Sequence, residues 1–325
     1  MPKQTLESLF VDRQIDLLRY SAGEINKAIA RINKLEKTLK AELLGANINR
    51  ANEIKTLLSL IDKVVRDYYA GISQQISEPQ AELHAVEMAA TAQMVSKASN
   101  QSVMLVVSQK AFRDMVMGAP LADWWDAQSS HVKFNLRSVV NRMVSDGQTA
   151  QQAVQEFSAV FDGSRRFAKT LVLTAHSAVT EQARDSLYKA NDDIVKGVYQ
   201  LSTLDSRTSP ICRVRDGLQW DSQRKPIGHD QEYKRPPLHY RCRSLMLPLI
   251  EGMTHSTRAS ADGQVDANLN YEGWLKRKSQ AEQDAILGKG KAQMWREGKI
   301  TFADMLDQTG REISLKDLQD KFNKN

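Results

Sequence analysis

The chain is poor in cysteine, has no long apolar run and lacks the apolar start of a secreted protein. Two cysteines in 325 residues exclude a small disulfide-stapled scaffold. No stretch approaches the ~18 apolar residues of a membrane span, and the first residues, MPKQTLESLFVDRQ, contain no apolar core of a signal peptide. We therefore expect synthesis in the cytosol, reduced thiols at the time of folding and no membrane partner.

The short motifs of several enzyme classes are also absent. No Gly-rich phosphate loop, HExxH helix or paired-carboxylate constellation occurs in the sequence. We therefore expect that the protein is not an enzyme. A hydrophobic fraction of 41% with 26% charged residues is typical of a soluble globular protein, and the length suffices for two domains or for one domain with a helical extension.

Helical spacing dominates the first part of the chain. One apolar stripe steps by four and three residues alternately, and a second stripe follows a turn at Gly45. The first stripe consists of Val11, Ile15, Leu18, Ala22, Ile25, Ile29 and Ile32, and the second of Ile54, Leu57, Leu58, Ile61, Val64, Val65 and Tyr68. Because only about three heptads are clean, the pattern favours an intramolecular helical hairpin over an oligomeric coiled coil.

Further helices are expected at residues 131–144, 149–161 and 164–190. Trp124 and Trp125 lie among apolar neighbours, which favours burial over stacking on nucleic acid. His176 has no carboxylate four residues away to orient it, so we interpret it as a core or surface histidine and not as a metal ligand.

The pattern changes near residue 197, where a strand and turn module begins. VYQLSTLD reads as a strand that leads into a turn at residues 205–210. Asp216-Gly217, between Val214 and Leu218, predicts a β-hairpin, and residues 243–249 predict a closing strand. The polar run at residues 251–270 reads as a loop or linker before a last set of helices.

These patterns together predict an α+β fold. It is predominantly helical, with a long N-terminal helical hairpin and a small β-hairpin and strand module around Cys212, His239 and Cys242. We expect three segments: a helical arm at residues 1–117, a core at 118–250, and a linker with C-terminal helices at 251–325.

The two cysteines and His239 form the candidate site, with Asp205 in the turn beside it. Three interpretations stay open: a disulfide, a metal site and two buried thiols that hold the module together. Two thiolates and an imidazole would suit zinc, with Asp205, His229 or a water as fourth ligand. A Cys–His nucleophile would need an orienting third group and an exposed thiol. We favour the structural interpretation without a cofactor.

The candidate site lies in a basic stretch. The net charge is +6, and residues 205–243 carry nine Lys and Arg against five acidic residues. Four arginines are candidates for non-specific contact with DNA phosphates; they are Arg213, Arg215, Arg241 and Arg243. Alternatively, they pair with the interleaved aspartates or with a partner protein.

Several strings in the chain resemble one family. LDSRTSPIC, DGLQW and PPLHYRCRS at residues 204–244 are similar to the signature of the phage Mu F-like minor head proteins, the phage head morphogenesis family. GAPLADWW at 118–125, LYKAN at 187–191 and YEGWLKRKSQAEQDAILGKGKAQMWREGKITFADMLDQTGREISLKDL at 271–318 extend the resemblance to roughly residues 118–318.

The resemblance implies a low-copy protein of the virion of a tailed phage, made in the host cytoplasm and bound to the portal inside the head. It implies action in head morphogenesis, DNA packaging or genome ejection. Its partners would be the portal protein, the major capsid or scaffolding protein, and packaged double-stranded DNA. An alternative from another class is a Cys/His-dependent hydrolase or toxin-like enzyme carried in the virion.

The chain also departs from the family pattern. Many relatives carry a second cysteine close to the first and another after the His-x-x-Cys-Arg motif, whereas here Ser209 and Ser244 stand near those places. Leu173-Thr174 replaces an Arg-Thr pair that is common in the preceding helix. A full set of four cysteine ligands for zinc is therefore absent.

Overall fold

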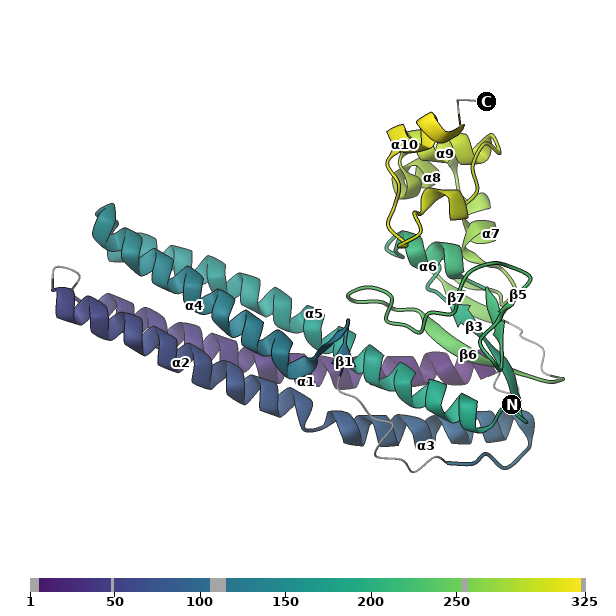
Figure 1. Ribbon diagram of the computed structural model, residues 1–325, viewed down its shortest axis with the longest axis horizontal. Helices are drawn as coiled ribbons and strands as arrows, with labels where there is room; N and C mark the ends of the chain where they lie inside the picture. Colours follow the sequence, from purple (N-terminus) through teal and green to yellow (C-terminus); the bar gives the residue numbers. More distant parts are fainter. Residues whose placement is uncertain (1–5, 48–49, 106–114, 253–256, 323–325) are drawn as a thin grey trace. The chain divides into compact units, whose positions relative to one another are not determined.

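The structure is a computed structural model that describes residues 6–47, 50–105, 115–252 and 257–322 (Figure 1). The chain forms two compact units. The first comprises Met1–Gln14, Val86–Ser108 and Thr180–Asn325, and the second comprises Ile15–Ala85 and Gln109–Val179. The segment ends expected after residues 117 and 250 are not boundaries between these units, because α1, α3 and α5 each contribute residues to both.

The second unit is built on long helices. α1 (Leu6–Gly45) and α2 (Ala51–Ser77) form the predicted hairpin, and α4 (Leu121–Ser145) and α5 (Ala150–Ala190) form another; α3 (Gln80–Ser99) follows α2. One apolar cluster joins α1, α2, α4 and α5, with Leu35, Ile61, Leu136 and Phe161 all fully buried. Figure 1 shows these helices lying side by side.

The predicted stripe on α1 was wrong in its first half. Ile15 and Leu18 are 42% and 47% exposed, whereas Leu17, Ser21 and Ala28 are buried. The apolar pattern missed this face because two of its buried positions, Ser21 and Glu24, are polar. Ser21 is hydrogen-bonded to His176, with 2.8 Å between Ser21 Oγ and Nδ1, so burial there costs no unsatisfied hydroxyl.

Later parts of the bundle agree with the expected burial of Trp125, which is fully buried. The Trp124 indole donates to the Val116 carbonyl across 2.8 Å, beside the short strands β1 (Met115–Val116) and β2 (Ala119–Pro120). The split expected near residue 162 is absent, because α5 continues through Gly163. His176 is buried, as a core histidine.

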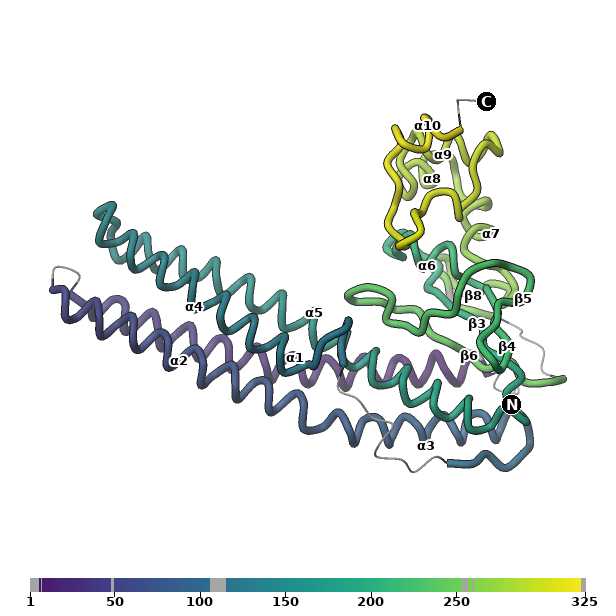
Figure 2. Tube along the Cα trace, viewed as in Figure 1, coloured from purple at the N-terminus to yellow at the C-terminus, as the bar shows by residue number. Residues whose placement is uncertain are grey.

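The first unit contains an antiparallel sheet in the order β5-β4-β3-β6 (Figure 2). The strands are β3 (Val195–Leu201), β4 (Gln219–Asp221), β5 (Pro226–Ile227) and β6 (Leu245–Ile250). β3 and β6 pair from Leu201 opposite Leu245 to Val195 opposite Ile250. An apolar cluster of this unit joins the sheet to Phe10, Val95 and Tyr188.

Two local predictions for this unit were wrong. Residues 210–215 form the helix α6 (Pro210–Arg215) and not a strand; Ser209 followed by Pro210 at the first helical position is a helix start that outweighs the Asp216-Gly217 turn signal. The expected linker contains a hairpin of β7 (Thr257–Ser260) and β8 (Gly263–Asp266). The polar sequence did not predict this hairpin, because its buried residue Arg258 is charged and is held by an ion pair.

The C-terminal segment is helical, as expected. It contains α7 (Tyr271–Lys276), α8 (Gln280–Leu287), α9 (Lys289–Arg296), the 3-10 turn η2 (Ala303–Met305) and α10 (Leu315–Phe322). Their apolar side chains form a third cluster around Tyr271, Trp274 and Trp295. Among the helices in the described ranges, none is long and apolar enough to cross a membrane.

Candidate metal centre

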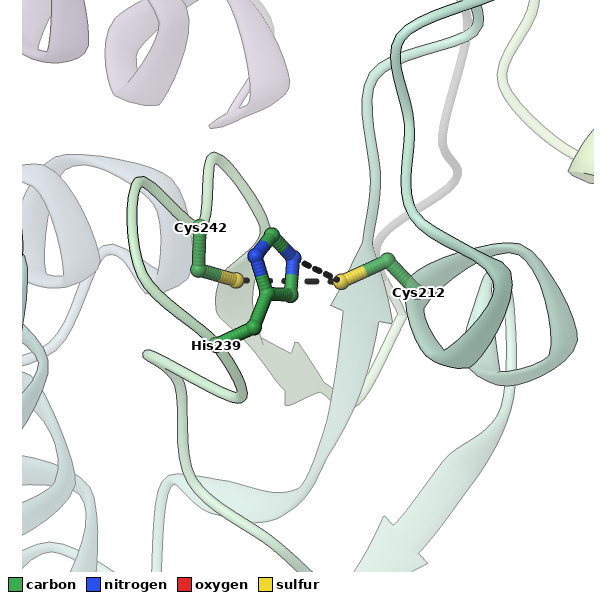
Figure 3. Close-up of side chains that lie close together, drawn as sticks. All are labelled: Cys212, His239 and Cys242. Atoms are coloured by element: carbon green, nitrogen blue, oxygen red, sulfur yellow. Dashed lines mark hydrogen bonds between the residues drawn. The ribbon is translucent and has the colours of Figure 1, made fainter. Parts of the chain in front are cut away.

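Cys212, His239 and Cys242 meet in the first unit (Figure 3). Cys212 Sγ lies 3.3 Å from His239 Nε2 and 3.7 Å from Cys242 Sγ. All three candidate ligand atoms lie within 4.8 Å of one another. The three side chains are thus close enough to hold a metal ion.

Two short local structures place these side chains. α6 carries Cys212 on its buried side. The loop before β6 carries His239 and Cys242, and the Cys242 amide donates to the His239 carbonyl across 3.1 Å. This tight turn puts the imidazole and the second sulfur on the same side of the loop, opposite α6 (Figure 3).

The imidazole is oriented by a backbone contact. His239 Nδ1 lies 2.8 Å from the Tyr240 carbonyl oxygen, so it is the protonated nitrogen and donates this hydrogen bond. Nε2 then faces the sulfurs. Histidines that bind metals usually show this arrangement, with the distal nitrogen hydrogen-bonded to a carbonyl or carboxylate.

Because the two thiols are close together, their pKa values shift in opposite directions. The neighbouring Cys242 and burial raise the pKa of Cys212. The pKa of Cys242 is lowered by its hydrogen bond with Cys212, against burial, and further by His239. The contact with Cys242 in turn raises the pKa of His239. One sulfur therefore ionises readily while the other keeps its proton, unless a cation neutralises both.

Serine hydroxyls surround Cys212. The nearby hydroxyls of Ser209 and Ser244 act to lower the pKa of the Cys212 thiol, against the larger effects of Cys242 and burial. Ser209 Oγ is buried and makes no hydrogen bond with the residues that the structure describes. Ser202 Oγ lies 2.9 Å from Ser244 Oγ and donates to the Cys212 carbonyl, also across 2.9 Å. Ser209 and Ser244, the serines that stand near the further cysteine positions of the family that the sequence resembles, thus both lie close to Cys212.

Asp205 and His229 do not join the cluster as the suggested fourth ligand. Arg243 grips Asp205 with two hydrogen bonds of 2.7 Å each. Burial alone would raise the pKa of Asp205, but Arg243 lowers it to about 2. His229 Nε2 is bound to the Gln219 carbonyl at 2.8 Å, and the ring packs edge-on against Trp220.

The arginines proposed for DNA contact make internal interactions. Arg243 pairs with Asp205, and Arg213 donates to the carbonyls of Thr208 and Ile286. Arg215 is buried over the Trp220 ring, with 4.8 Å between the guanidinium carbon and the ring centroid. Arg241 is exposed. The alternative expectation, that the arginines pair with the interleaved aspartates, therefore holds for Arg243.

A buried ion pair lies within the same module, and the sequence patterns did not predict it. Arg258 and Asp216 form a two-pronged pair at 2.8 and 2.9 Å, and Asp216 also accepts from the Ser202 amide at 2.7 Å. Burial raises the pKa of Asp216, against the effect of Arg258. A single arginine among the polar residues of 251–270 gives no sequence signal of its own.

The remaining interpretations of the cysteines differ in their fit. The two thiols are free, so no disulfide joins them. Cys212 and Cys242 are only 2% and 7% exposed, which is unlike an accessible nucleophile. No carboxylate among the described residues joins the three-residue cluster to orient His239.

Comparison with known proteins found no matching family model, no matching curated protein and no matching solved structure. The resemblance to the head morphogenesis family therefore stays a prediction.

Proposed function

We propose that the protein is a minor head protein of a tailed phage, acting at the portal in head morphogenesis, DNA packaging or genome ejection. One observation carries the proposal: residues from separate strings of the sequence signature contact one another in one structural module. Cys212 meets His239 and Cys242, and Asp205 pairs with Arg243. If the strings resembled the family signature by chance, there would be no reason for their residues to contact one another.

The long helices of the second unit fit such a role. α1 and α5 contain 40 and 41 residues, and rigid helical surfaces are common recognition elements. Their core is closed by their own side chains, so the bundle can present its outer faces to the portal, the major capsid protein or a scaffolding protein.

Co-expression with the portal protein of the same source genome tests this function. We expect the two proteins to co-purify and this chain to be present in mature heads at low copy number. The variant Arg243→Leu removes the ion pair with Asp205 and should reduce the incorporation of this chain into heads. Failure to co-purify together with absence from heads would contradict the proposal, and a hydrolytic activity lost in Cys242→Ser would favour the virion-enzyme alternative.

We further propose that Cys212, His239 and Cys242 hold zinc as a structural ion. Two thiolates on one zinc ion are expected to lie about 3.8 Å apart, given Zn–S bonds of about 2.3 Å and tetrahedral angles. The sulfurs lie 3.7 Å apart, close to this separation, and the Nδ1 contact with Tyr240 orients the imidazole. Bound zinc would neutralise the thiolates and cross-link α6 to the loop before β6.

Elemental analysis of protein purified without chelator tests the ion. We expect about one zinc per chain at this three-residue site, and loss of zinc in Cys242→Ser. Ser59→Cys, which adds an exposed thiol on α2, serves as the control and should not change the zinc content. Metal-free wild-type protein with an unchanged unfolding temperature after zinc addition would support the structural-thiol interpretation instead.

A further inference from the structure

A second candidate site, also bounded by α6, is a cleft of about 320 Å³ within the first unit. Ile211, Val214 and Leu306 give it an apolar lining, and Arg215 and Lys234 add two cations. The cleft is separate from the Cys212 cluster, because none of its lining residues is a member of that cluster.

Arg215 is exceptional among the buried arginines. The structure describes three arginines as buried: Arg184, Arg215 and Arg258. Arg184 pairs with Glu87 and Glu181, and Arg258 pairs with Asp216. Within the described ranges, Arg215 has no carboxylate at ion-pair distance. A buried cation without an anion is costly.

Neutral groups satisfy only part of this guanidinium. Nε lies 3.3 Å from the Gln200 amide oxygen, and Nη2 donates to the Glu232 carbonyl across 2.8 Å. Nη1 makes no hydrogen bond with the residues that the structure describes. Because burial lowers the pKa of Arg215, the side chain would gain from an anion placed in the cleft.

The other charges of the cleft are exposed. Lys234 lines the cleft, is exposed and forms no ion pair within the described part of the chain. Asp230, Glu232 and Asp307 also line it, but each is exposed, so solvent screens them more than it screens Arg215. Asp307 Oδ1 is already occupied by the Thr309 hydroxyl and the Arg311 amide.

We propose that this cleft binds a single carboxylate carried on an aliphatic stem, with the carboxylate at Arg215 and Lys234 and the stem against Ile211, Val214 and Leu306. Such a group occurs in a free aliphatic acid and in a glutamate flanked by aliphatic residues of a partner peptide. With one buried cation and three exposed carboxylates in its lining, the cleft suits a single anionic group better than a polyanion such as nucleic acid, which would meet all three carboxylates. The inference does not depend on the proposed head function.

Methyl NMR of the full chain, labelled at Ile, Leu and Val, tests the site with defined probes. Hexanoate should shift the methyl signals of Ile211, Val214 and Leu306 saturably. Hexanol should bind about tenfold or more weakly, since it lacks the charge-assisted hydrogen bonds. Inorganic phosphate should leave these signals unchanged. Equal binding of hexanol, or phosphate shifts as large as those of hexanoate, would overturn the proposal.

Two capped peptides distinguish the source of the carboxylate. Acetyl-Leu-Glu-Leu-amide binding more tightly than hexanoate, with acetyl-Leu-Gln-Leu-amide inactive, indicates a peptide partner; hexanoate binding more tightly indicates a free acid. If neither carboxylate binds, the proposal is wrong.

Variants locate the interaction. Arg215→Gln should abolish hexanoate binding, and Lys234→Gln should weaken it. Should Arg215→Gln fail to fold, Lys234→Gln and the wild-type comparison of hexanoate with hexanol still decide, because Lys234 is exposed. Lys225→Gln, an exposed lysine outside the cleft lining, is the control and should bind as the wild type does. Unchanged hexanoate binding in Lys234→Gln would show that the Lys234 ammonium does not contact the carboxylate, which contradicts that part of the proposal.

Discussion

At the scale of single residues, Ser209 is informative because it stands near a place where many members of the family that the sequence resembles carry a second cysteine. Its buried hydroxyl lies close enough to Cys212 to lower the pKa of that thiol, but it makes no hydrogen bond with the described residues and gives α6 no side-chain cap. A cysteine at this position would therefore add a thiolate beside the existing cluster without removing a helix cap.

We expect Ser209→Cys to raise zinc affinity by at least about tenfold, since a fourth protein ligand completes the usual set of structural zinc. Competition with a chromophoric chelator measures the affinity, and cobalt substitution should give sulfur-to-metal charge-transfer bands. Ser59→Cys on α2 is the control, because it adds a thiol on an exposed position outside the cluster. Equal affinities of the two variants would contradict the expectation.

His176 shows how burial acts on a titrating group in the second unit. Desolvation lowers its pKa from 6.5 to about 4. Between these values the unfolded chain binds more protons than the folded one, so the stability present above pH 6.5 is lost as the pH falls toward 4.

We expect His176→Gln to lose about 2 kcal/mol less stability than the wild type between pH 7 and pH 5. Gln keeps a polar partner for Ser21 and cannot take up the proton. Urea unfolding at the two pH values measures the difference, and His131→Gln, at an exposed position on α4, is the matched control. The explanation fails if both variants lose as much stability as the wild type.

At the scale of elements, α6 and the β7–β8 hairpin show where sequence patterns stop being sufficient. The helical hairpin was predictable because its apolar residues recur with a helical period. α6 has six residues, too few for a period, so only its Ser209-Pro210 start could have revealed it. The hairpin was missed because its anchor is a charged residue.

That anchor gives a prediction for Arg258. Arg258→Ala would leave Asp216 buried without its cation, and we expect a loss of about 3–5 kcal/mol in the free energy of unfolding. Arg207→Ala is the control: its pair with Asp205 spans 3.6 Å and the arginine side chain is 81% exposed, so a change below about 1 kcal/mol is expected. Urea unfolding compares the two, and similar losses would exclude an anchoring role.

The candidate site was predictable in its members but not in its surroundings. Rarity of cysteine and the His-x-x-Cys spacing brought Cys212, His239 and Cys242 together on sequence grounds, and the structure places them within 4.8 Å. Asp205 was assigned to the cluster because it is close in sequence, yet its charge is taken by Arg243. Which carboxylate meets which arginine depends on tertiary packing, and no local pattern encodes it.

At the scale of the whole molecule, the chain divides its apolar residues among separate clusters. The helices of the second unit share one cluster, whereas the sheet and the C-terminal helices of the first unit use two others. Regions with separate cores can open separately, each with its own free energy. A change at the Cys212 cluster should therefore be felt mainly within the first unit.

Hydrogen exchange of the intact chain tests this separation. In Cys242→Ser, we expect faster exchange of amides in α6, β3 and β6, because the substitution removes a buried sulfur that faces Cys212. Amides of α2 and α4 should keep their protection, since their side chains belong to the other core. Val140→Ala, a fully buried position on α4, should give the reverse pattern. Uniform acceleration throughout the chain in both variants would mean that the two units open as one cooperative structure, and that the module around Cys212 has no stability of its own.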